Sequence, residues 1–158
     1  MADMLVQLLK LPALDPLVQG LREQGVIVRR AQPWEITPVR QFVGQHFYPN
    51  WADEVSVGFA RQPVSVFLAI REGKIIGFSA SECTRRNFFG PEGVLEGERG
   101  KGIGKALLIA GLHGLREMGY AYAIVGWAGQ EEFYRKTVGA ISIPDSSPGV
   151  YADPLSPS

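Results

Sequence analysis

Apolar and polar residues follow two different periods along this chain, and the pattern predicts both strands and helices. Residues 26–28 form a short apolar run of the kind found in strands. Segments 64–70 and 74–81 are strand-like and separated by a Glu-Gly turn, so they predict a hairpin. Apolar residues at helical spacing predict helices over 34–46 and 51–60.

The second half of the chain continues this mixture of elements. Gly119 and Gly139 each follow a helical pattern and mark its end. In chain order, the expected elements are a loop over 87–91, a strand at 94–95, a helix over 103–118, a strand over 120–127, a helix over 131–137, and strands at 141–143 and 149–151.

The first residues of the chain are expected to be helical. Leu5, Leu8 and Leu9 are spaced for one helical face, and Asp15-Pro16 has the composition of a helix N-terminus. The chain is thus divided into an N-terminal helical extension (1–24), a main domain (25–152) and a flexible tail (153–158).

Length and composition limit the classes to which the protein can belong. The 158 residues, 46% apolar and 20% charged, suit one globular domain that needs no disulfide or metal. The 16 basic and 16 acidic residues cancel, so no nucleic-acid or membrane partner is expected. Cys83 has no partner for an internal disulfide, and two histidines give no metal-ligand spacing. We expect a cytoplasmic protein, because we find neither a bilayer-spanning apolar run nor a secretory signal.

The stretch 94–108 is the most informative about chemistry. Glycines at 100, 102 and 104 leave backbone N–H groups uncovered at the point where a helix begins near Ile103. The positive end of that helix and three basic residues, Arg99, Lys101 and Lys105, favour an anion at this turn. We therefore predict a phosphate or pyrophosphate site.

Spacing excludes two common nucleotide loops. A P-loop requires Ser or Thr after Gly-Lys, but Ala106 follows Gly104-Lys105. The dinucleotide fingerprint that starts at Gly102 requires glycine at position 107, which is Leu107.

The remaining pattern, Arg99 followed by Gly102 and Gly104, resembles the acyl-CoA pyrophosphate loop of the GNAT superfamily of N-acetyltransferases. That loop reads Gln or Arg, two residues, Gly, one residue, then Gly or Ala. Three further segments resemble the family in the same order, so that the likeness covers roughly 25–152: they are 28–31, Gly119-Tyr120 before an apolar strand, and 133–136 closed by Gly139-Ala140.

This resemblance implies an α/β (α+β) fold of one domain, with a mixed central sheet of about six to seven strands flanked by helices. It also implies an enzyme that transfers an acetyl group from acetyl-CoA to a primary amine by direct attack and a tetrahedral intermediate. The expected CoA-binding residues are Val94, Leu95, Arg99, Gly100, Lys101, Gly102, Ile103, Gly104 and Lys105.

Two residues are candidates for proton transfer. The resemblance places Tyr134 near the sulfur, where a phenol can protonate the departing thiolate; the alternative is that Tyr134 packs in the core with Phe133. Glu82 could serve as the general base, but an ion pair with Arg85 or Arg86 explains it equally well.

One feature departs from the family pattern. The stretch 126–130 lacks the asparagine that many members use to contact the pantetheine arm. The acceptor, a small-molecule or peptide amine, would be selected by 47–51, 85–89 and the turn near Asp145. The first two segments carry aromatic residues beside basic ones, which suits an acceptor with an apolar part and a carboxylate; the alternative is that these aromatic residues close the core under a loop.

Two alternative functions stay open. The protein could be a catalytically idle acyl-CoA-binding sensor that keeps the loop without a base. It could also be a structural protein whose N-terminal segment builds a homodimer.

Overall fold

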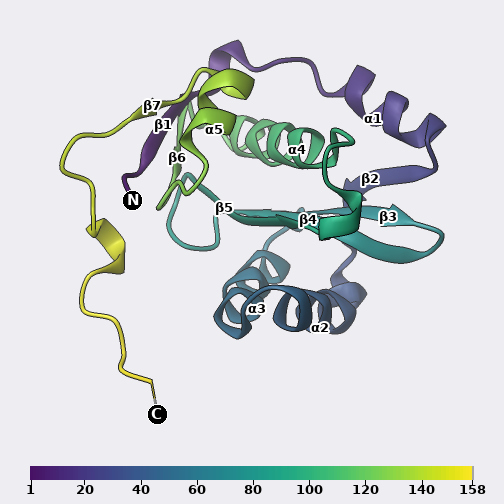
Figure 1. Cartoon of the computed structure of the whole chain (residues 1–158), viewed down its shortest axis with the longest axis horizontal. Coiled ribbons are helices and arrows are strands. Elements are labelled where there is room, and N and C mark those ends of the chain that lie inside the picture. The colour runs from purple at the N-terminus through teal and green to yellow at the C-terminus, as the bar shows by residue number, and fades with distance from the viewer. Residues whose placement is uncertain (158) are drawn as a thin grey trace.

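The computed structural model describes residues 1–157 as one mixed sheet with helices on both faces (Figure 1). The seven strands lie in the order β2-β3-β4-β5-β6-β1-β7, and every neighbouring pair is antiparallel except β5 and β6. The strands are β1 (Met4–Gln7), β2 (Val26–Arg30), β3 (Val66–Arg71), β4 (Lys74–Ser81), β5 (Phe88–Val94), β6 (Tyr122–Val125) and β7 (Ile141–Ser142). The helices are α1 (Asp15–Glu23), α2 (Ile36–His46), α3 (Pro49–Ser56), α4 (Ile103–Glu117) and α5 (Glu131–Val138).

The helices form two layers. Figure 1 shows α1, α4 and α5 on one face of the sheet, with α2 and α3 on the other. Helix α4 is buried nearly all round because β1, β6 and α5 cover one side of it and α1 with β2 covers another. The opposite core, under α2 and α3, is centred on Phe78 of β4. The expected single-domain fold with a mixed sheet is confirmed.

The parallel pair β5 and β6 is the irregular part of the sheet. The two strands are in register only at Phe88 with Ile124 and at Phe89 with Val125. Beyond these positions β5 continues along β4 as far as Val94, while β6 has ended. The edge of β5 that faces β6 is therefore left without a strand partner over residues 90–94.

The expectation of helix over residues 1–24 is wrong at its start. Met4–Gln7 forms β1, which is inserted between β6 and β7 and runs antiparallel to both. Met4 and Val6 are buried, whereas Gln7 is exposed, so these residues follow the period of a strand. A short apolar run fits either element, and only the vacant position beside β6 decides between them. Helix α1 is confirmed.

Two further expectations are corrected. The loop expected over 87–91 is largely part of β5, which begins at Phe88. The strand expected at 149–151 is a short 3-10 helix, Gly149–Tyr151, beyond the last strand of the sheet. The hairpin and the long helix after the glycine turn are confirmed, and across residues 1–157 no helix is both long and apolar enough to cross a membrane.

Adjacent leucines after β1 test the corrected N-terminus. Leu8 is completely buried against α4, whereas Leu9 is 61% exposed. We expect Leu8→Ala to lower the free energy of unfolding by about 3 kcal/mol, because it leaves a cavity. Leu9→Ala should change it by less than about 0.5 kcal/mol. Urea-induced unfolding measures both, and equal losses would instead support a helix with both leucines on one buried face.

Candidate functional site

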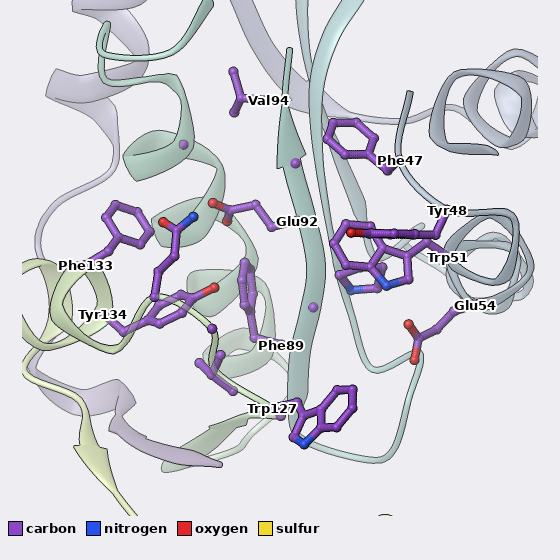
Figure 2. A pocket seen from close by; sticks show the side chains of 18 of the residues that line it. Phe47, Tyr48, Trp51, Glu54, Phe89, Glu92, Val94, Trp127, Phe133 and Tyr134 are labelled. Atoms are coloured by element: carbon purple, nitrogen blue, oxygen red, sulfur yellow. The ribbon is translucent and has the colours of Figure 1, made fainter. Parts of the chain in front are cut away.

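A cavity of about 890 Å³ opens where β5 and β6 diverge. Its walls come from α3, β5, the start of α4, the turn after β6, and α5. Figure 2 looks into it and shows Glu92 and Tyr134 on one side of β5, with Trp51 and Glu54 on the other. The cavity therefore passes through the sheet by way of the unpartnered edge of β5.

The first turn of α4 forms one end of the cavity. Gly100 and Gly102 have φ values of +79° and +85°, in the left-handed region that only glycine adopts freely. Gly102 is the N-cap, and no side chain of the described residues caps the helix. The N–H groups in the first turn of this fifteen-residue helix therefore face the cavity without a capping side chain.

Most of the predicted CoA-binding residues come together at this end. Of the nine, seven line the cavity, and the two exceptions are Leu95 and Lys101. Leu95 packs against the core and donates its N–H to Ile76 O on β4 at 2.9 Å. The Lys101 ammonium pairs with Glu98 at 3.1 Å. The other seven are Val94, Arg99, Gly100, Gly102, Ile103, Gly104 and Lys105.

Val94 offers backbone groups to the cavity. Since the N–H of Leu95 points to β4, strand alternation turns the N–H and C=O of Val94 toward the gap. The Arg99 Nε donates to Val94 O at 3.3 Å, which holds the guanidinium beside this edge.

Glu98, an acidic residue at this end of the cavity, is already paired. Arg71 donates twice to Glu98, at 3.1 and 3.0 Å, and Lys101 donates once. These hydrogen bonds, those of Arg71 first, lower the pKa of Glu98. Arg99 and Lys105 therefore give the lining its uncompensated positive charge at the start of α4.

Glu92, which the sequence analysis missed, is the most unusual group in the cavity. Its carboxyl points from β5 toward α4 and α5 (Figure 2). Oε2 is inaccessible to solvent and has no hydrogen-bond partner among residues 1–157. Burial raises the pKa of Glu92 well above its ordinary value. A charged residue in the middle of a strand would have indicated this group, but the expected loop ended at residue 91 and the expected strand began at residue 94, so position 92 was assigned to neither.

Tyr134 projects from α5 into the same part of the cavity (Figure 2). Its ring also packs edge-on against Phe133, with centroids 5.2 Å apart, and both rings contact the core around α4. Burial and, secondarily, the charge of Glu92 raise the pKa of Tyr134, so the hydroxyl keeps its proton. The cavity and packing interpretations of this residue are therefore compatible.

Glu82 lies elsewhere. It is only 5% exposed, and its carboxylate accepts hydrogen bonds from the Tyr120 hydroxyl at 2.7 Å and from Asn87 N at 2.6 Å. Arg61 approaches the same carboxylate at 3.9 Å. Glu82 thus anchors the connection between β4 and β5, and it does not line the cavity.

The far end of the cavity is aromatic and contains a second carboxyl group. Glu54 of α3 accepts a hydrogen bond from Thr84 Oγ1 at 2.6 Å, and burial raises its pKa. Tyr48 and Trp51 stand on the same side of the cavity as Glu54 (Figure 2). No cluster of three His, Cys, Asp or Glu side chains that could hold a metal ion occurs within residues 1–157.

Trp127 completes this end from the turn after β6. Its φ is +50°, which is unusual for a bulky residue, and its backbone N–H donates to Oδ1 of the buried Asp3 at 2.8 Å. The indole stacks on Tyr151, with centroids 5.2 Å apart. The sequence analysis missed Trp127 and Tyr151, because residues far apart in the chain build this wall.

Comparison with solved structures identifies the fold. A GCN5-related glucosamine N-acetyltransferase region of a fungal multi-domain GH3 beta-N-acetylglucosaminidase matches with a TM-score of 0.71 and 17% identity. A GCN5-related N-acetyltransferase from Sphaerobacter thermophilus matches with a TM-score of 0.65 and 19% identity. Each match covers 90% of this chain, which spans only 19% and 48% of those two proteins.

A third match has a bound ligand. A GNAT family acetyltransferase from Brucella melitensis, in complex with acetyl-CoA, has a TM-score of 0.54 and 20% identity over 75% of this chain and 88% of its own. No family model and no curated protein matches the sequence. The chain thus has the GNAT fold, as the sequence resemblance implied.

The buried carboxyl of Glu92 makes stability depend on pH. The folded state holds this proton more tightly than the unfolded chain, so the unfolding free energy falls as pH rises from the ordinary pKa of 4.5 toward the raised value. Glu92→Gln removes this loss. We expect the free energy of unfolding of the variant to equal that of the wild-type protein at about pH 4 and to exceed it at about pH 8.

Urea unfolding at the two pH values measures this difference. Glu96→Gln, at an exposed position close by, is the control and should shift stability equally at both. A pH-independent effect of Glu92→Gln would contradict a buried, protonated carboxyl.

Proposed function

We propose that this protein is an acetyl-CoA-dependent N-acetyltransferase of the GNAT superfamily that acts on a primary amine. The observation that carries the proposal is one cavity that joins the positive start of α4 to the half-buried phenol of Tyr134 through the gap beside β5. The Brucella melitensis protein of similar fold was crystallised with acetyl-CoA, which supports the same donor here.

The donor would bind in two parts. The pyrophosphate sits on the N–H groups of Gly102 to Lys105, with Arg99 beside it. The pantetheine arm lies along the free edge of β5 and takes the place of the missing strand. There it contacts the backbone N–H and C=O of Val94. Leu95 supports this edge from the core, and Lys101 acts through its pair with Glu98.

Proton transfer is assigned to Tyr134 and Glu92. The amine nitrogen attacks the thioester carbonyl carbon, and a carboxylate at Glu92 accepts the proton that the nitrogen loses. The carbon–sulfur bond then breaks as Tyr134 donates its proton to the thiolate. The protonated Glu92 restores the tyrosine proton, so both groups end as they began. We place Glu92 in the role first considered for Glu82, whose oxygens are occupied.

Donor binding is tested first without an acceptor. We expect CoA to raise the melting temperature of the protein, whereas pantetheine, which lacks the pyrophosphate, has little effect. Arg99→Ala should weaken CoA binding about tenfold by calorimetry, because it removes a charged contact to phosphate. Arg116→Ala, exposed in the last turn of α4, is the matched control. No stabilisation by CoA would refute the assignment of the donor.

Tyr134→Phe tests the general acid. We expect kcat to fall about a hundredfold, with the Kd for acetyl-CoA within about twofold of wild type. Tyr122→Phe, at an exposed tyrosine of β6, should leave both unchanged. Thiol release from acetyl-CoA with an amine panel measures kcat. Unchanged turnover in Tyr134→Phe removes this residue as the acid, and CoA binding without thiol release for any amine identifies the binding module instead.

A further inference from the structure

We propose that the acceptor is a dication, a linear diamine or polyamine, whose second positive charge binds at Glu54 between aromatic rings. This inference rests on the proposed function, because it places the reacting amine at the gap beside β5. It assigns the chemistry of the end of the cavity that lies farthest from α4.

Charge is distributed unevenly along the cavity lining. The uncompensated basic residues of the lining, Arg99 and Lys105, lie at the start of α4, where the pyrophosphate is assigned. Glu54 is the charged residue of the lining at the aromatic end. Its one hydrogen-bond partner in the described chain is the neutral Thr84 hydroxyl, and Glu54 forms no salt bridge with a described residue. A cationic ligand supplies a partner for its carboxylate.

Arg85, a basic residue close to this wall, lies outside the cavity lining. Arg85 is near enough to lower the pKa of Tyr151, which partly offsets the rise that burial causes. However, its guanidinium donates to Thr84 O at 2.9 Å, and Arg85 does not line the cavity. An acceptor carboxylate, which the sequence analysis considered, therefore meets no basic side chain of the lining at this end.

Two pairs of aromatic rings line this end of the cavity. Tyr48 and Trp51 meet edge to face, with centroids 4.9 Å apart, and Trp127 and Tyr151 stack at an interplanar angle of 22°. Tyr48 is 57% and Trp127 46% exposed, so the rings of both pairs are open to a ligand. Aromatic faces attract ammonium groups, and several rings around one carboxylate form a cation-binding cage.

Strand β5 separates Glu54 from the side of the cavity that holds Tyr134. Tyr134 belongs to α5 and Glu54 to α3, and these helices cover opposite faces of the sheet (Figure 1). Figure 2 shows their side chains on opposite sides of β5. A nitrogen close enough to attack a thioester beside Tyr134 therefore does not contact Glu54 as well. The charge at Glu54 belongs to a second group, several bonds along the acceptor.

The test compares three acceptors of equal length: hexanediamine, hexylamine and aminohexanoate. We expect kcat/KM for hexanediamine to exceed that for hexylamine by about tenfold, with aminohexanoate lowest. Glu54→Gln should abolish the advantage of the diamine, leave hexylamine within about twofold and leave the KM for acetyl-CoA unchanged. Asp53→Asn, which removes an exposed charge from the same helix, is the matched control and should change none of these.

The outcomes separate the two proposals. Thiol release with no preference for the diamine, or an equal loss for hexylamine in Glu54→Gln, overturns the dication while the acetyltransferase stands. If no amine releases thiol, the proposed activity fails. Calorimetric titration of hexanediamine into the CoA-bound protein then decides the site: binding that Glu54→Gln removes supports it, and absence of binding overturns it.

Discussion

The site depends on one constraint: β5 and β6 are parallel neighbours that pair at only two positions. Backbone N–H and C=O groups in the middle of a sheet need partners, and residues 90–94 have no strand partner on the side of β6, where Arg99 Nε donates to Val94 O. That edge therefore requires an extended ligand with amide groups, or water, to take the place of a strand. The same divergence opens a passage between the two helical layers, so a ligand lying along β5 is reachable from both faces.

The N-terminal strand stabilises the other side of this passage. β1 pairs with β6, and Ala2 O accepts a hydrogen bond from Ala128 N in the turn that follows β6. Asp3 then holds the N–H of Trp127, which allows a bulky residue to keep a left-handed conformation. The aromatic wall therefore depends on the first residues of the chain as well as on Tyr151 near its end. The N-terminal segment is part of the site's framework.

The sequence predicted the regular parts of this architecture because their signals are local. The glycine turn, the start of α4 and the hairpin are each specified by neighbouring residues, and the seven lining residues among the predicted CoA ligands follow from them. What it did not predict depends on distant partners. Nothing near Met4 specifies a place beside β6, and Glu82 could not be separated from a catalytic carboxylate until Tyr120 and Asn87 were found bonded to it. Glu92 was hidden for the same reason, since its burial is a property of the assembled cavity.

Burial of Glu92 also resolves an electrostatic conflict. Its Oε1 lies about 3.5 Å from where a Cβ on Gly104 would be, so an ionised carboxylate there would stand under the turn assigned to the pyrophosphate. Because burial raises its pKa, the carboxyl favours the protonated form, which does not cancel the positive end of α4. A carboxyl with a raised pKa is also a stronger base once it does ionise, which suits it to take a proton from an amine. The position that is least favourable for a fixed negative charge is therefore suitable for a titrating one, whereas Glu54 of the cavity lining lies on the opposite side of β5.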